Sequence, residues 1–111
     1  MRNLDTGAVV ASSVRTATSP LSRLKGLLGT ASLPRGEALV IRPCTGVHTF
    51  FMKYAIDVVF VDDGGVVLAV YDTLRPYRAT RIFRDAAAAI ELPAGAGRES
   101  GVKEGDRLEI T

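Results

Sequence analysis

The sequence has 111 residues, which is the length of one ordinary domain built around one hydrophobic core. A composition of 47% hydrophobic and 23% charged residues excludes a disordered or fibrous chain, and 14 Lys and Arg against 12 Asp and Glu exclude a surface that is basic throughout. The single cysteine excludes an intramolecular disulfide, and there is neither a leader-like N-terminus nor an apolar run of ~20 residues, so we expect an unprocessed cytoplasmic protein without a membrane span.

The first part of the chain predicts one strand and one short helix. Residues 8–14 predict a first strand. In the segment 18–29, Ser19 is well placed as an N-cap and Pro20 as the first helical residue. Four leucines then follow at helical spacing, before Gly29 as a stop: Leu21, Leu24, Leu27 and Leu28. We therefore expect a short amphipathic helix after the first strand.

Most of the remaining chain predicts strands separated by Gly, Pro and Asp. Runs rich in Val, Ile and Phe predict strands over 37–43, 47–52, 56–62, 66–74 and, at the end of the chain, 106–110. The Asp-Asp-Gly-Gly sequence at 62–65 suits a tight turn and predicts a hairpin between its two flanking strands. The segment 75–85 is expected to be irregular after Pro76. The alanine-rich run 86–92 favours a strand over a helix, although four successive alanines favour helix locally.

These elements favour a mainly β domain spanning 1–111. Strands joined by short turns, with one short helix near the N-terminus, predict an antiparallel sandwich or a partly closed barrel. The alternation of strands and helices that is typical of nucleotide-binding folds is missing from the pattern.

Five short blocks together resemble a known family. They are T-x4-R-x2-G-L from Thr18, F-M-K at 51–53, I-D-V-V-F-V-D at 56–62, E-L-P-A-G at 91–95 and G-V-K-E-G-D at 101–106. Their order and types resemble domain-of-unknown-function family 192 (DUF192) of bacteria and archaea. The resemblance implies a compact, mainly β domain of sandwich or barrel-like topology, and it implies no assigned reaction.

The sequence departs from the family's common pattern around the F-M-K block. Phe51 stands where the family tends to have Trp, and Tyr54-Ala55 where it tends to have Asn-Thr. Cys44, with His48 and Thr49, resembles a subgroup that has Cys and His-Thr ahead of this block. If those positions contact a ligand in the family, the ligand of this protein differs.

The only cysteine and the only histidine form a C-x3-H pattern, Cys44 and His48. Positions four apart in a strand lie about 13 Å from each other, so a shared zinc ion would need a bend at Thr45-Gly46 and further ligands. We expect no metal and no cofactor. As an enzyme, the protein would use Cys44 as nucleophile, His48 as activating base and Asp57 to orient the imidazole. A hairpin of 47–52 with 56–61 would, however, place Asp57 opposite Met52 and leave His48 further along the ladder.

Asp57 is unusual because apolar residues surround it on both faces of its predicted strand. Its carboxylate must therefore find hydrogen bonds or a cation. The favoured interpretation is a structural one, in which Asp57 caps the loop that contains Lys53 and Tyr54; a ligand-binding role is the alternative. Asp106 is expected to be a turn aspartate that accepts nearby backbone N–H groups.

Four arginines recur at every third position in the segment 75–84: Arg75, Arg78, Arg81 and Arg84. Tyr77 and Phe83 lie between them, so the segment could contact phosphate or carboxylate groups and stack on bases. The favoured interpretation is a solvated loop whose arginines pair with Asp72, Asp85 and Glu91.

The sequence as a whole favours a non-enzymatic binding module for an unknown small molecule or protein. The alternatives are an enzyme that uses Cys44, His48 and Asp57, and a weak binder of anionic ligands or nucleic acid through the segment 75–84. Nucleic acid is not the favoured partner, because a net charge of +2 supports few phosphate contacts. The residues expected to contact the ligand are Cys44, His48, Met52, Lys53, Asp57 and Arg78.

Overall fold

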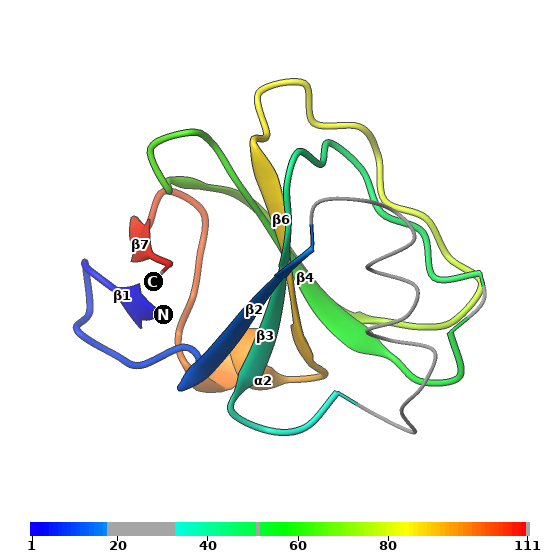
Figure 1. Cartoon of the computed structure of the whole chain (residues 1–111), viewed down its shortest axis with the longest axis horizontal. Coiled ribbons are helices and arrows are strands. Elements are labelled where there is room, and N and C mark those ends of the chain that lie inside the picture. Colours follow the sequence, from blue (N-terminus) through cyan, green and yellow to red (C-terminus); the bar gives the residue numbers. More distant parts are fainter. Residues whose placement is uncertain (18–32, 51, 111) are drawn as a thin grey trace.

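The computed structural model describes residues 1–17, 33–50 and 52–110 and shows a mainly β, sandwich-like fold (Figure 1). The five strands of the main sheet are, in spatial order, β2 (Ser13–Ala17), β3 (Glu37–Ile41), β6 (Ala88–Pro93), β4 (Ile56–Val61) and β5 (Val67–Leu74). A second, two-stranded sheet pairs β1 (Arg2–Asn3) with β7 (Leu108–Glu109), and the described residues hold one short helix, α2 (Ala96–Glu99). The expected mainly β class is thus confirmed, and no barrel closes within the described ranges.

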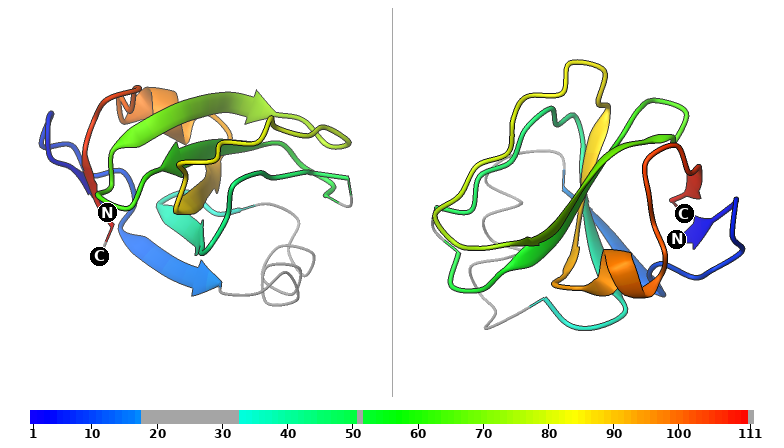
Figure 2. Two further views of the ribbon diagram at one scale, coloured as in Figure 1. Left: turned by 90° about the horizontal axis from the view of Figure 1, so that it is seen from above. Right: turned by 180° about the vertical axis from the view of Figure 1, so that it is seen from behind.

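The three inner strands β3, β6 and β4 are buried on both faces of the sheet. One face carries the first core cluster, whose largest members from β4 are Ile56, Val58 and Phe60. The other face carries the second core cluster, to which β4 contributes Val59 and Val61. Figure 2 shows α2, β1 and β7 on the side of the second cluster, with long connections on the opposite side. Burial on both faces explains why these strands are continuous apolar runs without polar alternation.

The hairpin predicted at 62–65 is confirmed. β4 and β5 pair antiparallel, and Asp62 Oδ1 accepts the N–H groups of Gly64 and Val66 at 2.9 and 3.0 Å. Gly65 has φ of 82°, in the left-handed region, and a Cβ there would lie 2.6 Å from the Leu108 carbonyl oxygen. Glycine is therefore required at this turn for both its conformation and its size.

The first strand was predicted in the wrong place, and one strand pair is parallel. Residues 8–11 make only an isolated bridge from Val9 to Arg2, and the ladder begins at Ser13, where β2 runs parallel to β3. The nineteen residues between these two strands are long enough for the crossover that a parallel pair requires. The helix predicted at 18–29 lies outside the described residues.

The predicted strand at 47–52 is also wrong: among its described residues, 47–50 and 52, only His48 makes a β-bridge, and that bridge is to Ala79. The segment cannot form the expected hairpin with β4, because β4 is already paired with β5 on one side and with β6 on the other. Asp57 consequently lies opposite Leu92 of β6, not opposite Met52. The alanine-rich run, by contrast, forms the predicted strand: β6 pairs with both β3 and β4, and this pairing overrides the local helix preference of alanine.

The buried carboxylate of Asp57 accepts three backbone N–H groups, one from β5 and two from the start of α2. Its Oδ1 accepts the N–H groups of Thr73 at 2.8 Å and of Gly95 at 2.9 Å, and its Oδ2 accepts the N–H of Gly97 at 2.8 Å. The expectation that Asp57 caps the loop with Lys53 and Tyr54 is therefore wrong: it caps the end of β5 and the first turn of α2. Gly97 is needed there, because a Cβ would lie 3.1 Å from Asp57 Oδ2.

Replacing Asp57 by Asn should lower the free energy of unfolding by about 2–4 kcal/mol, because the amide group cannot accept all three N–H groups and turns a donor toward one of them. Urea unfolding followed by circular dichroism measures this. The matched control is Asp72→Asn, which removes an exposed carboxylate that pairs with Arg98 and should cost under about 1 kcal/mol. Equal losses in the two variants would contradict the role assigned to Asp57.

Asp106 closes the C-terminal turn, as expected, and also holds the N-terminus. Its Oδ2 accepts the Lys103 N–H at 3.0 Å and the Asn3 side-chain amide at 2.9 Å. These two hydrogen bonds, first that from Asn3 and then that from Lys103, hold the pKa of Asp106 below its ordinary value against the opposing effect of burial. Because the pKa is lower in the folded state, this stabilisation is complete above the unfolded pKa and is lost as pH falls through the folded pKa.

The stability difference between the native protein and Asp106→Asn should therefore be constant near neutral pH and shrink once pH falls below about 4. Urea unfolding at a series of pH values measures it, with Asp63→Asn, an exposed turn residue, as the control. A difference that grows on acidification would show that Asp106 is not held in its ionised form by these bonds.

Candidate functional site

Two irregular segments, 44–50 and 75–84, run side by side over the face of the first core cluster; we call them the arginine ribbon (Figure 1). Backbone hydrogen bonds join them at regular intervals: Thr49 N–H to Arg78 O, Thr80 N–H to Val47 O, and Phe83 N–H to Thr45 O, each at 2.8 Å. His48 forms an isolated bridge with Ala79. The expected irregular loop is thus one half of a paired structure, and its partner is the segment that had been predicted as a strand.

Thr49 fixes the geometry of the arginine ribbon. It is completely buried, and its Oγ1 donates to Arg75 O at 2.6 Å and accepts the Arg78 N–H at 3.0 Å. Its backbone carbonyl accepts the N–H of Tyr77 at 3.0 Å and that of Met52 at 3.2 Å. Side-chain bonds of this kind compete with a regular ladder, which explains why 47–50 is not a strand. Sequence reasoning gave Thr49 no role beyond a family match.

The side chains that the arginine ribbon presents to solvent are cationic and apolar. All four arginines are exposed, as are Phe50 (45%), Tyr77 (70%) and Ile82 (62%). The Arg81 guanidinium lies 4.5 Å from the centre of the Phe83 ring, and His48 stacks on Phe50 with ring centres 5.0 Å apart. In binding sites, guanidinium groups contact anions, and both guanidinium groups and aromatic rings stack on flat rings of a ligand.

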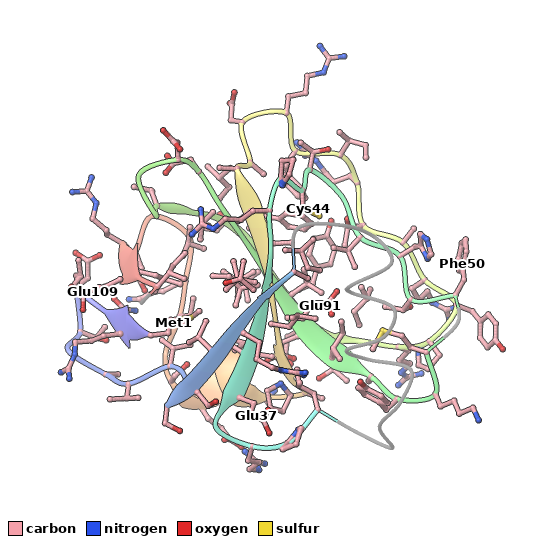
Figure 3. All side chains as sticks on the ribbon, in the orientation of Figure 1. Met1, Glu37, Cys44, Phe50, Glu91 and Glu109 are labelled. Carbon is pink, nitrogen blue, oxygen red and sulfur yellow. The ribbon has the colours of Figure 1, made fainter. Side chains whose placement is uncertain are left out.

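The expected pairing of these arginines with acids is wrong for the described residues. The ion pairs there are Arg15–Glu37, Arg35–Glu99 and Arg98–Asp72, so Asp72 pairs with an arginine outside the ribbon. Glu91 is completely buried in the middle of the sheet. Figure 3 shows it apart from Phe50, which marks the outer end of the ribbon. The four ribbon arginines thus keep their charges available to a ligand.

The three candidate catalytic side chains do not form one cluster. Cys44 is half-buried, packs against the first core cluster and donates its Sγ–H to Gly46 O at 3.1 Å. His48 is exposed, and its Nδ1 accepts the Phe50 N–H at 3.5 Å. Asp57 alternates with Ile56 and Val58, so it lies on the opposite face of the sheet, with its carboxylate bound to backbone N–H groups. This geometry does not support a Cys-His-Asp mechanism.

The six residues predicted to contact a ligand divide between three environments. His48, Lys53 and Arg78 are exposed, and His48 and Arg78 belong to the arginine ribbon. Met52 and Cys44 pack in and against the first core cluster beneath it. Asp57 is separated from the others by the sheet. Within the described ranges, no group of three or more His, Cys, Asp or Glu side chains is placed to hold a metal ion.

The fold and the site define a small, mainly β domain with a cationic ribbon laid over one face of its sheet. The family model of DUF192, described as uncharacterized ACR, matches residues 2–110, so this chain belongs to the DUF192 family. The resemblance inferred from the five sequence blocks is thereby confirmed. In the described part of the chain, no helix has the length and apolar character needed to cross a membrane.

Archaeal relatives carry the name UPF0127. The chain is 32% identical over 114 residues to a UPF0127 protein of Pyrococcus furiosus, an alignment that covers 98% of the chain and 96% of the relative. It is 40% identical over 63 residues to a UPF0127 protein of Pyrococcus abyssi, covering 57% of the chain and 53% of the relative.

Two solved structures share the fold. One is a proposed transcription regulator from Sinorhizobium meliloti 1021, with a TM-score of 0.73 and 23% identity, covering 86% of this chain and 79% of that one. The other is a protein of unknown function from Novosphingobium aromaticivorans DSM 12444, with a TM-score of 0.75 and 20% identity, covering 86% and 73%. At these identities the likeness concerns the fold.

Replacing Thr49 by Val should loosen the arginine ribbon, because the methyl group leaves the partly buried Arg78 N–H without its acceptor, at a cost of about 1–3 kcal/mol. Hydrogen exchange at the Arg78 amide should accelerate, and urea unfolding gives the loss of stability. The control is Thr49→Ser, which keeps the hydroxyl and should preserve the slow exchange. Fast exchange in the native protein would contradict the assigned role of Thr49.

Proposed function

We propose that the protein is a non-enzymatic binding module that takes a ligand bearing phosphate or carboxylate groups on the arginine ribbon. The observation that carries this proposal is the exposure of four arginines on a ribbon whose backbone is held in place by Thr49. A preorganised backbone lowers the entropy lost when the ligand binds. The arrangement supports binding and offers no converging nucleophile and base.

The distribution of charge supports an anionic ligand. The arginine ribbon, 44–50 and 75–84, holds four arginines and no Asp or Glu, while the rest of the chain has ten Lys and Arg against twelve Asp and Glu. The overall charge of +2 therefore hides a positive ribbon on an acidic remainder. A positive field on one side of the molecule orients an anion toward that side during association.

Tyr77 supports a binding role by its backbone conformation. It has φ of 61° although it is not glycine, a conformation that costs on the order of 1 kcal/mol or more and concentrates at functional sites. The Tyr77 N–H bond to Thr49 O holds this conformation while the ring is 70% exposed. The protein thus holds an aromatic ring in solvent between Arg75 and Arg78, where it can cover an apolar or aromatic part of the ligand.

The number of charges limits the strength of binding. Three or four arginine contacts to a single-stranded nucleic acid release few counterions, so such binding is weak and salt-sensitive. The description of one structural neighbour as a proposed transcription regulator is compatible with an anion-binding surface. The charge of this ribbon nevertheless favours a small or short anionic ligand over a surface that holds a long polyanion.

A labelled single-stranded oligonucleotide, used as a polyanionic probe, should bind weakly and lose affinity about 20- to 50-fold between 50 and 200 mM salt, as three or four phosphate contacts require. Fluorescence anisotropy measures this. Polyglutamate of similar length should compete if charge is the main recognition element. Tight binding that survives the higher salt would contradict the proposal of a small ionic site.

Variants separate the ribbon from the rest of the surface. Arg75→Gln and Arg78→Gln should each weaken probe binding several-fold, whereas Arg98→Gln, which removes an exposed arginine paired with Asp72, should leave it unchanged. Tyr77→Gly should weaken binding while leaving stability unchanged or raised, because glycine adopts the same φ without strain. Equal effects of Arg78→Gln and Arg98→Gln would show that binding reflects overall charge.

A further inference from the structure

A pocket of about 250 Å³ lies where the chain leading into β2 passes α2 and the residues before β3, and none of its lining residues belongs to the arginine ribbon. Figure 2, right, shows α2 and the ribbon segments in different parts of the fold. The apolar lining of the pocket comes from Val9, Val10, Pro93 and Ala96. Arg35 and Glu99 line it as well and form an ion pair with each other. The pocket therefore combines a small apolar surface with one positive and one negative group.

Most other polar atoms of this pocket are already engaged within the protein. Ser100 Oγ donates to Ala96 O at 2.7 Å, and the Val10 N–H donates to Met1 O at 2.9 Å. The Gly36 carbonyl accepts the N–H groups of Ser12 and Ser13 at 2.8 and 3.0 Å. A ligand would consequently find its polar partners in the two charged side chains.

The ion pair can be exchanged for contacts to a ligand at little cost. The side chains of Arg35 and Glu99 are 69% and 56% exposed, and an ion pair so exposed contributes about 0–1 kcal/mol to stability. A ligand with a single charge would pair with only one of the two side chains. The other side chain would lose its partner while the bound ligand covers the apolar surface beside it. A ligand with both charges can satisfy both.

We propose that this pocket binds a small zwitterion with a branched apolar side chain, the class to which free branched-chain amino acids belong. Its carboxylate would contact Arg35, its ammonium group Glu99, and its side chain the apolar lining. Val9, whose side chain is 56% exposed at this place, would be covered by the ligand. A volume below the usual ~300–1,000 Å³ of pockets for drug-sized molecules fits a ligand of this size. The proposal is independent of the arginine ribbon.

L-leucine is the probe, and nuclear magnetic resonance of the isotope-labelled full chain is the measurement. Titration should give saturable, concerted shifts of the Gly36, Ala96 and Ser100 amide signals with a Kd of about a millimolar, which is reasonable for so few ligand atoms. The signals of Thr49 and Arg78 should not move. No saturable shift up to about 50 mM would overturn the proposal, since this already lies well above that Kd.

Two leucine analogues test the requirement for both charges on the native protein, without any variant. 4-Methylpentanoate lacks the ammonium group and 3-methylbutylamine lacks the carboxylate, and each should bind about tenfold more weakly than leucine, as expected for one lost charged hydrogen bond. Equal affinity of either analogue would overturn the assignment of a zwitterion. This comparison stands even if a variant fails to fold.

Variants test the two side chains. Arg35→Gln and Glu99→Gln should each weaken leucine binding about tenfold. The matched control is Arg98→Gln, which removes the neighbouring arginine of α2 and its exposed ion pair with Asp72 but does not alter the pocket lining, so its Kd should stay within about twofold. A loss in Arg98→Gln as large as that in Glu99→Gln would overturn the proposal.

Discussion

The arrangement of the sheet depends on one buried carboxylate. Asp57 is the second residue of β4, has no exposed surface, and accepts N–H groups from the end of β5 and from the turn that leads from β6 into α2. Buried charge is costly unless hydrogen bonds replace the lost water, and here three backbone donors do so. The Thr73 N–H lies where the register of β5 against β4 shifts, and the Gly95 and Gly97 N–H groups belong to the N-cap and first turn of α2. Asp57 thus holds this irregular part of β5 and the start of α2 against β4.

The location of the arginine ribbon follows from the sheet. Because β4 is paired on both edges, the segments 44–50 and 75–84 do not pair with it, and they lie over the face of the sheet that carries the first core cluster. Val47, Met52 and Ala86 anchor them in the first core cluster, so the alternate positions must face solvent. Thr49 adds side-chain hydrogen bonds to the backbone hydrogen bonds that join the two segments. A cationic surface is therefore attached to a rigid core through a few buried anchors.

Much of the fold could be predicted from local pattern, and the errors have a common physical origin. β3, β4 and β5 fall within predicted runs, β6 overlaps the run predicted at 86–92, and the Asp-Gly turn at 62–65 is in place, because apolar runs and turn residues act locally. The errors at 8–14 and 47–52 concern which edge a segment can join, and that depends on the whole sheet. A strand, a long connection and another strand were visible at 13–41, so the parallel pair β2–β3 could have been inferred.

The candidate site was predictable as a set of residues but not as an arrangement. The spacing of Arg75, Arg78, Arg81 and Arg84 drew attention to the right segment, while nothing in the sequence showed that 44–50 lies against it or that Thr49 joins the two. Asp57 was correctly predicted to be buried and hydrogen-bonded, but its donors lie 16, 38 and 40 residues away in sequence. Contacts over such separations leave no local pattern.

Net charge describes this binding surface poorly for a related reason. Several acids serve the backbone: Asp57, Asp62 and Asp106 each accept N–H groups at turns and strand ends, and Asp5 accepts the Arg107 N–H at 2.7 Å. Backbone hydrogen bonds hold these four carboxylates in place, and in the described part of the chain none of them pairs with a ribbon arginine. Because charged groups interact strongly only over about a Debye length of ~8 Å, a ligand at the ribbon experiences the local charge and not the total of +2. The placement of the acids, as much as that of the arginines, makes this surface suitable for an anion.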